Sequence, residues 1–182
     1  MKRFLLPFAC TLFILLQACT NKPNSEQTNT ASTALTNETS TVPAGSGAAL
    51  SSRLRDIGMN TESDWRGINV GDPATKVRET EKAKLFENDA KHLGYTLEFA
   101  NLESIDMQYQ LGTDQTVTGI DVDLYLNDAQ SVDAYKTDLK RYFDARYKPA
   151  QTPGTWQGEG GKKIALRDVS KGKDYGLKVA IN

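Results

Sequence analysis

The sequence predicts an α+β fold in which two helices pack on an antiparallel β-sheet, in the order α-β-β-β-α-β-β(-β). Three observations predict this class. Polar and apolar residues alternate along several segments, one long segment has apolar residues three and four apart, and helices are segregated from strands. The order also reads as two α-β-β-β units, a repeat of pattern with little residue identity between the units.

The first helix is predicted in the segment WRGINVGDPATKVRETE and extends to about Lys84. Asp72 is its expected N-cap, and Pro73 suits the first helical position because the missing N–H would have no partner there. The apolar face of this helix is thin, since it contains little more than Ala74 and Val77.

Three segments with period-two alternation follow, and we expect each to be a strand with one buried and one solvated face. Short turns join them, which favours an antiparallel meander. The alternating apolar positions are Tyr95, Leu97 and Phe99; then Ile105, Met107, Tyr109 and Leu111; then Ile120, Val122, Leu124 and Leu126.

The segment NDAQSVDAYKTDLKRYFDARYKP predicts the strongest helix of the chain. Asn127 or Asp128 can cap its start, and Pro149 should stop it. Its apolar stripe consists of Val132, Tyr135, Leu139, Phe143 and Tyr147. Two further strands are expected around 164–166 and 177–181, with a short one at 155–157.

Residues 1–18 have the pattern of a secretory signal peptide that ends immediately before a cysteine. A basic start precedes an apolar run at 4–16, which is too short to span a bilayer as a helix. The motif LQAC, ending at Cys19, resembles the lipobox of bacterial lipoproteins. This resemblance implies cleavage before Cys19 and acylation of its sulfur, so that the lipid bilayer is a partner of the mature chain. An ordinary signal peptide and an uncleaved anchor are the alternatives.

Residues 19–52 are expected to form the lipidated cysteine and a disordered tether, followed by a single domain at 53–182. Of the 33 residues in 20–52, 21 are Ser, Thr, Asn, Gly or Pro, and none is aromatic. Such a tether spans roughly 30 Å. Thr20 follows the cysteine where an aspartate would signal inner-membrane retention, so the lipoprotein resemblance implies the outer membrane of the cell envelope.

Composition excludes several classes of site from the expected domain. The two cysteines are Cys10 in the signal and Cys19, so the domain has no thiol for a disulfide, a zinc-thiolate site or a nucleophile. Without Lys2 and Arg3, 20 basic residues face 23 acidic ones, and we expect no nucleic acid partner.

The charges are unevenly distributed along the domain. Residues 93–130 contain seven acidic and no basic residues, whereas 131–182 contain 11 basic and six acidic ones. The two parts either attract each other within one fold or form a bipolar surface that orients a charged partner.

The helix entry INVGDPATKV and the order of elements resemble small envelope proteins of the BamE (SmpA/OmlA) family and the β-lactamase-inhibitor protein. Gly71, Asp72, Pro73 and Val77 carry the resemblance at the helix entry. It implies binding to other proteins without catalysis.

The predicted contact surface consists of residues that face outward or can anchor a partner. Asp121, Asp123 and Tyr125 lie on the expected solvated face of one strand. Trp65 and Trp156 lie beside glycines near element ends, where each is either a core edge or an exposed anchor. With Asp106 on the neighbouring strand, the two aspartates could also collect a hard cation such as calcium, but a solvated sheet face is the simpler interpretation.

Two other candidates have simpler interpretations as well. His92, with Asp89 three residues before it on an expected helix end, could act as a general base, but no nucleophile motif or second ligand accompanies it. The segment GTWQGEGGKKIAL lacks the glycine and hydroxyl positions of a phosphate loop and precedes a strand, so its glycines favour a turn.

Together these observations predict a membrane-tethered envelope module that binds a protein or an envelope polymer, without catalytic residues, cofactor or metal. A small hydrolase with an unrecognised carboxylate pair and a small-ligand carrier are the alternatives. The hydrolase would need a cleft with at least two acids of raised pKa, and the carrier a deep apolar pocket.

Overall fold

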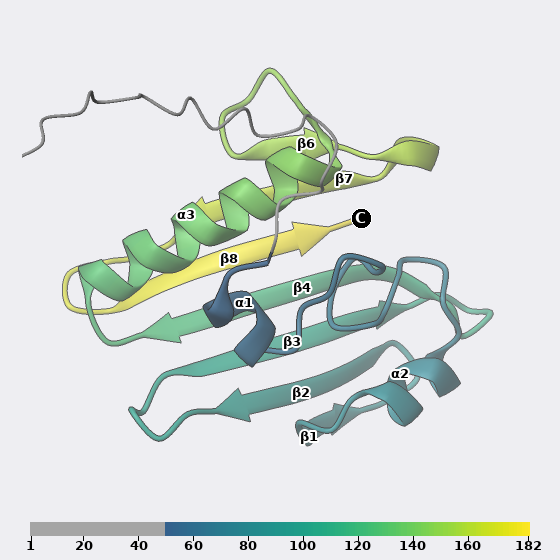
Figure 1. Ribbon diagram of the computed structural model, residues 1–182. Coiled ribbons are helices and arrows are strands. Elements are labelled where there is room, and N and C mark those ends of the chain that lie inside the picture. The colour runs from purple at the N-terminus through teal and green to yellow at the C-terminus, as the bar shows by residue number, and fades with distance from the viewer. Residues whose placement is uncertain (1–49) are drawn as a thin grey trace, which may run out of the picture. The chain divides into compact units, whose positions relative to one another are not determined.

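The computed structural model describes residues 50–182, which contain one antiparallel sheet of eight strands and three α-helices (Figure 1). The helices are α1 (Ser52–Asp56), α2 (Ala74–Thr80) and α3 (Ala129–Arg146), with a short 3-10 helix η1 (Glu159–Gly161). The strands are β1 (Lys84–Asn88), β2 (His92–Glu98), β3 (Ser104–Leu111), β4 (Val117–Leu126), β5 (Lys148–Pro149), β6 (Thr155–Gln157), β7 (Lys163–Asp168) and β8 (Tyr175–Ile181).

The sheet order is β1-β2-β3-β4-β8-β7-β6-β5, so that a helix followed by a four-stranded meander occurs twice along the chain. The last strands of the two meanders, β4 and β8, pair with each other in the middle of the sheet. The α+β class and the antiparallel sheet are therefore confirmed. The element order differs in detail, because α1, β1 and β5 were not expected.

Helix α2 is shorter than the sequence predicts, because it ends at Thr80, and β1 begins at Lys84, where the helix was expected to end. The backbone is already extended at Glu81 (φ −70°, ψ 128°), directly after Thr80. The Glu81 side chain points into the interior, where it accepts hydrogen bonds from Arg66 and Tyr109. A thin apolar face cannot keep the chain helical against this buried contact.

The expected cap of α2 is also wrong. The N-cap residue is Pro73, and no side chain caps the helix. Asp72 instead accepts hydrogen bonds from the backbone N–H of Asn69 and from Nζ of Lys76, both at 2.7 Å. Its carboxylate thus closes the loop before the helix.

Helix α3 follows its sequence pattern closely. Asp128 caps it by accepting the backbone N–H of Ser131 at 2.7 Å, and its buried residues are Val132, Tyr135, Leu139, Tyr142 and Phe143. The helix packs on β4, β7 and β8. It ends at Arg146, and the chain then turns into β5, where Pro149 pairs with Trp156. None of the helices in residues 50–182 combines the length and apolar character needed to cross a membrane.

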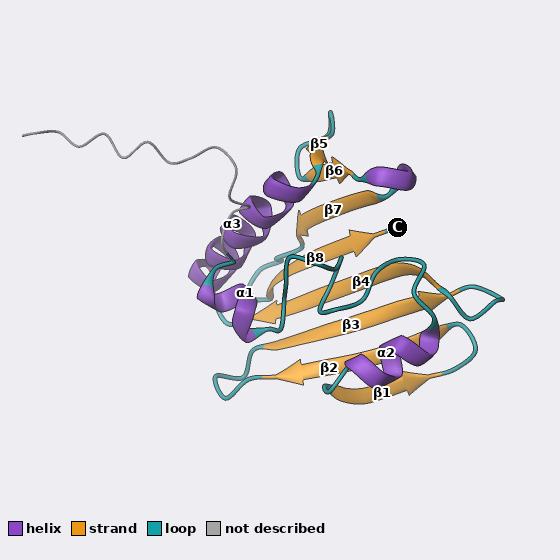
Figure 2. Ribbon diagram, turned by 45° about the vertical axis from the view of Figure 1, so that its right-hand side comes forward, coloured by secondary structure: helices purple, strands orange, loops and turns teal. Residues whose placement is uncertain are grey.

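All three helices lie on the same face of the sheet (Figure 2). The core between them is filled by side chains from both meanders, and the largest fully buried ones are Trp65, Tyr109 and Phe143. Helix α1 begins beside the expected domain boundary at residue 53, and Leu50 before it already packs against the core.

Candidate functional site

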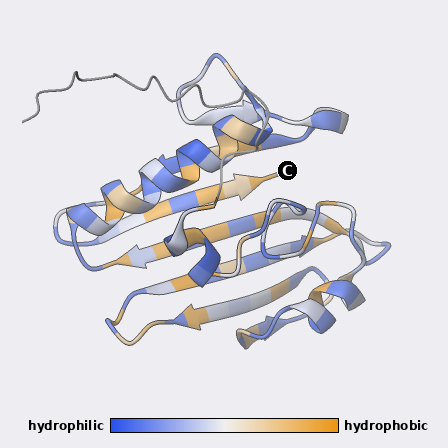
Figure 3. Cartoon of the chain, viewed as in Figure 1, coloured by the Kyte–Doolittle hydropathy of each residue, from blue (hydrophilic) through white to orange (hydrophobic). Residues whose placement is uncertain are grey.

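The face of the sheet opposite the helices is polar and is covered by no described helix (Figure 2). Hydrophilic and hydrophobic residues alternate along β3 and β4, as the strand pattern predicts (Figure 3). We call this surface the open face. Cross-strand pairing places one row of its residues across five strands, namely Thr96, Asp106, Asp123, Lys178 and Arg167.

The open face separates its charges into two halves. Asp106, Asp121 and Asp123 lie on β3 and β4, whereas Arg167 and Lys178 lie on β7 and β8. Nζ of Lys178 lies 3.1 Å from Oδ2 of Asp123 and joins the two halves. Among residues 50–182, Asp106 and Arg167 have no salt-bridge partner, so charge of both signs remains free on this surface.

Tyr125 is a large side chain that the open face presents to solvent, with 53% of its surface exposed. It lies opposite Ser104 on β3 and Gly176 on β8. A hollow of about 110 Å³ lies beside it and is also lined by exposed Val169. Partial burial raises the pKa of the Tyr125 hydroxyl, and the carboxylates of Asp123 and Asp106 raise it further. The exposed ring of Tyr125 therefore offers an apolar contact surface directly beside the acidic half of the open face.

The aspartates of the acidic half do not gather as a calcium site would require. Asp106 and Asp123 are cross-strand partners, but Asp121 accepts a hydrogen bond from Nε2 of Gln110, and Asp123 pairs with Lys178. Within the described part of the chain, the ligand atoms that do converge belong to Glu87, Asp89 and His92 in the hairpin between β1 and β2. The three aspartates form the solvated face that is the simpler interpretation of their pattern.

The two tryptophans lie in the core, not on an exposed surface. Trp65 is fully buried, and only 2% of Trp156 is exposed. The ring of Trp156 packs on Phe143 with 5.2 Å between centroids, and its Nε1 donates to Asp144 at 2.9 Å. Neither side chain is an exposed anchor. Both tryptophans belong to the core, which is the other of the two interpretations.

The glycine-rich segment before β7 forms a turn, as its glycines predict, and not a phosphate loop. Gly160 and Gly161 have φ values of 69° and 84°, which other residues adopt rarely. Lys162 at its end points inward, and its Nζ lies 2.6 Å from Oδ2 of Asp64. Tyr147 also donates to Asp64, at 2.9 Å. This half-buried lysine thus forms an ion pair with a buried carboxylate.

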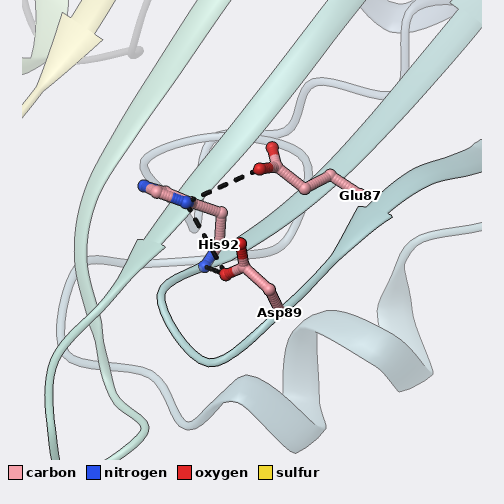
Figure 4. Close-up of side chains that lie close together, drawn as sticks. All are labelled: Glu87, Asp89 and His92. Carbon is pink, nitrogen blue, oxygen red and sulfur yellow. Dashed lines mark hydrogen bonds and ion pairs between the residues drawn. The ribbon is translucent and has the colours of Figure 1, made fainter.

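His92 begins strand β2 and is not on a helix. Its Nδ1 lies 3.6 Å from Oε1 of Glu87 on β1 and 3.6 Å from Oδ1 of Asp89 in the turn between the strands (Figure 4). Sequence reasoning missed Glu87, because it identified no strand at β1. The signal that could have identified Glu87 is its spacing. It is a carboxylate two residues before Asp89, and alternate residues along a hairpin lie on the same side.

A second hollow, of about 350 Å³, lies on the basic half of the open face. Small side chains line it on three neighbouring strands, Thr155 on β6, Ala165 on β7 and Ala180 on β8. Lys163 and Arg167 flank Ala165 along β7. This part of the surface can accept an acidic group from a partner.

Among the described residues, the carboxyl groups whose pKa departs from its usual value all have a lowered pKa. Hydrogen bonds from backbone N–H groups of Lys91 and His92 lower the pKa of Asp89, and hydrogen bonds from Thr116 lower that of Asp114. The pKa values of Asp144 and Asp168 are lowered mainly by hydrogen bonds from Lys140 and Ser170, respectively. A general acid at neutral pH needs the opposite shift.

No family model, no curated protein and no solved structure matches the chain in the comparisons. The expected signal peptide at 1–18 and Cys19 lie outside the described residues. The open face is therefore the candidate site on its geometry alone.

Proposed function

We propose that this protein is a lipid-anchored module of the bacterial envelope that binds another protein through the open face. The observation that carries the proposal is the arrangement of the sheet. Three helices cover one face, and the other presents separated acidic and basic halves with Tyr125 beside the acidic one. An exposed aromatic residue next to charges of both signs supplies affinity and orientation together.

The charge pattern favours a protein over an envelope polymer as the partner. A uniformly anionic polymer would match only the half formed by Lys163, Arg167 and Lys178 and would be repelled by Asp106 and Asp121. A protein can place basic residues against β3 and β4 and acidic residues against β7. Catalysis is not part of the proposal. A carboxylic general acid needs a raised pKa, whereas the pKa values of Asp89, Asp114, Asp144 and Asp168 are lowered.

Replacing Cys19 with serine should abolish lipid attachment. A serine oxygen does not take the place of the sulfur in the lipoprotein pathway, and each buried methylene of an acyl chain contributes about 0.8 kcal/mol to membrane binding. We expect radiolabelled palmitate to enter the natural chain and not the variant, and the variant to partition into buffer after detergent phase separation. Cys10→Ser is the matched control and should label normally. Equal labelling of Cys19→Ser and the natural chain would contradict the anchor.

Reversing charge on the acidic half should weaken partner binding at least about tenfold, because like charges would then face each other. The variant is Asp121→Lys with Asp123→Lys. A photo-crosslinking residue in place of Gln108 or Ala165, both on the open face, identifies the partner in cells, and the affinity is then measured with purified proteins.

Two controls distinguish the open face from the helix side. Glu79→Lys with Asp133→Lys makes the same change of charge at exposed positions on α2 and α3 and should leave the affinity unchanged. A crosslinker in place of Arg141, exposed on α3, should give no adduct with that partner. Equal crosslinking from α3, or an unchanged affinity in the Asp121/Asp123 variant, would show that the open face is not the binding surface.

A further inference from the structure

We infer that Glu87, Asp89 and His92 form a binding site for a divalent transition metal in the β1–β2 hairpin. One oxygen of each carboxylate and one imidazole nitrogen all lie within 4.8 Å of one another (Figure 4). The three ligands come from six consecutive residues, so the hairpin brings them together without help from distant parts of the chain. This site goes beyond the proposed function, and either can hold without the other.

The distances suit a metal of zinc size. Zinc binds imidazole nitrogen at about 2.0–2.1 Å and carboxylate oxygen at about 2.0–2.2 Å, which places tetrahedral ligands roughly 3.4 Å apart. Nδ1 of His92 already lies 3.6 Å from each carboxylate. Because the three ligand atoms lie within 4.8 Å of one another, small adjustments of the side chains bring them to zinc distances.

Neighbouring groups hold both carboxylates in place. Nε2 of Gln108 donates to Oε2 of Glu87 at 2.7 Å, which leaves Oε1 directed at His92. The backbone N–H groups of Lys91 and His92 both donate to Oδ1 of Asp89 at 2.7 Å. Partners of this kind orient metal ligands and reduce the entropy lost on binding.

The charge of the cluster is not balanced by the protein. Among the described residues, no lysine or arginine forms a salt bridge with Glu87 or Asp89, and the basic side chain that faces both carboxylates is His92. Imidazole binds a metal in its neutral form and then adds no charge, so the two carboxylates present two negative charges that a divalent cation neutralises. The cluster differs in this respect from Asp123, which forms a salt bridge with Lys178.

The ligand types favour a transition metal over calcium or magnesium. Calcium and magnesium take oxygen ligands, whereas zinc and its first-row neighbours accept imidazole together with carboxylate. The exposed fractions of the side chains are 34% for His92, 31% for Glu87 and 55% for Asp89. Water can therefore complete the coordination, and an affinity weaker than that of a closed structural site is expected.

Titration of the full-length protein in detergent with zinc chloride tests the site, with the His92 ring followed by NMR. His92 is the only histidine of the chain, so every change in an imidazole signal reports on this hairpin. We expect saturable shifts of the ring signals with a Kd below about 1 mM. Glu87→Gln and Asp89→Asn should each weaken binding at least about tenfold. Asparagine keeps an oxygen that can accept the two backbone N–H groups of the turn.

Asp114→Asn is the matched control, because Asp114 holds the β3–β4 turn through similar hydrogen bonds and lies outside the cluster. It should leave the zinc affinity unchanged. Ring signals that stay fixed up to about 1 mM zinc would overturn the site. Equal affinity of the three variants would overturn the ligand set, and ring shifts of the same size with calcium chloride would overturn the choice of metal.

Discussion

Replacing Arg66 with methionine should lower the free energy of unfolding by about 3–5 kcal/mol, because it leaves the Glu81 carboxylate buried without a cation. The Glu81 side chain is completely buried. Nε and one terminal nitrogen of Arg66 donate to its two oxygens at 3.0 and 3.1 Å, and the hydroxyl of Tyr109 donates at 2.6 Å. Urea unfolding at neutral pH, followed by circular dichroism, measures the loss.

A double variant separates the ion pair from general packing. In Arg66→Met with Glu81→Leu no charge is left buried, so the combined loss should be smaller than the sum of the two single losses by about 0.5–3 kcal/mol. Burial and the Glu81 carboxylate raise the pKa of Tyr109 well above its usual range, so its hydroxyl remains a donor that loses its acceptor in this variant. Strictly additive losses would show that the pair contributes nothing as a unit.

Replacing Lys162 with methionine should also destabilise the domain by about 3 kcal/mol or more, because the Asp64 carboxylate would be left without its cation. Only 3% of the Asp64 side chain is exposed, and Nζ of Lys162 lies 2.7 and 2.6 Å from its two oxygens. The hydrogen bonds from Tyr147 and from the backbone of Val70 remain but carry no charge. The midpoint of urea unfolding reports the change.

The neighbouring residue provides an internal control for that measurement. Lys163 is exposed and has no salt bridge among residues 50–182, so Lys163→Met should change stability by no more than about 0.5 kcal/mol. Two adjacent lysines thus differ greatly in effect, because one belongs to the turn that faces the core and the other begins a strand on the open face. Similar losses in both variants would contradict the inward position of Lys162.

The burial of Trp156 changes how the binding surface can be tested. Removing this ring would cost about 3–5 kcal/mol, since its contact with Phe143 lies in the core. A loss of binding in Trp156→Ala would therefore report unfolding as much as a lost contact. The half-buried Asp121 and Asp123 and the exposed Tyr125 are suitable for this test, because their side chains lie on the open face and not in the core.

The strands whose residues alternate between polar and apolar could be predicted from the sequence, whereas β1 and β5, which lack that alternation, could not. β3 alternates between buried and half-buried side chains along its whole length, as its residue pattern indicates. β1 has exposed Leu85 and Phe86 in succession, and Phe86 lies in a bulge between Leu85 and Glu87, so the residue order does not show which face of the strand is buried. Only its pairing with β2 makes it a strand.

The sequence by itself determined the α+β class, the alternation that leaves one polar sheet face, and the uneven charge of its two halves. Only the tertiary structure decided where the tryptophans lie, which lysine of the pair at 162 and 163 turns inward to Asp64, and that Glu87 lies beside His92. The physical reason is the range of the interactions. Alternation and helical spacing act within a few residues, whereas burial and ion pairing depend on which segments the folded sheet and helices bring side by side.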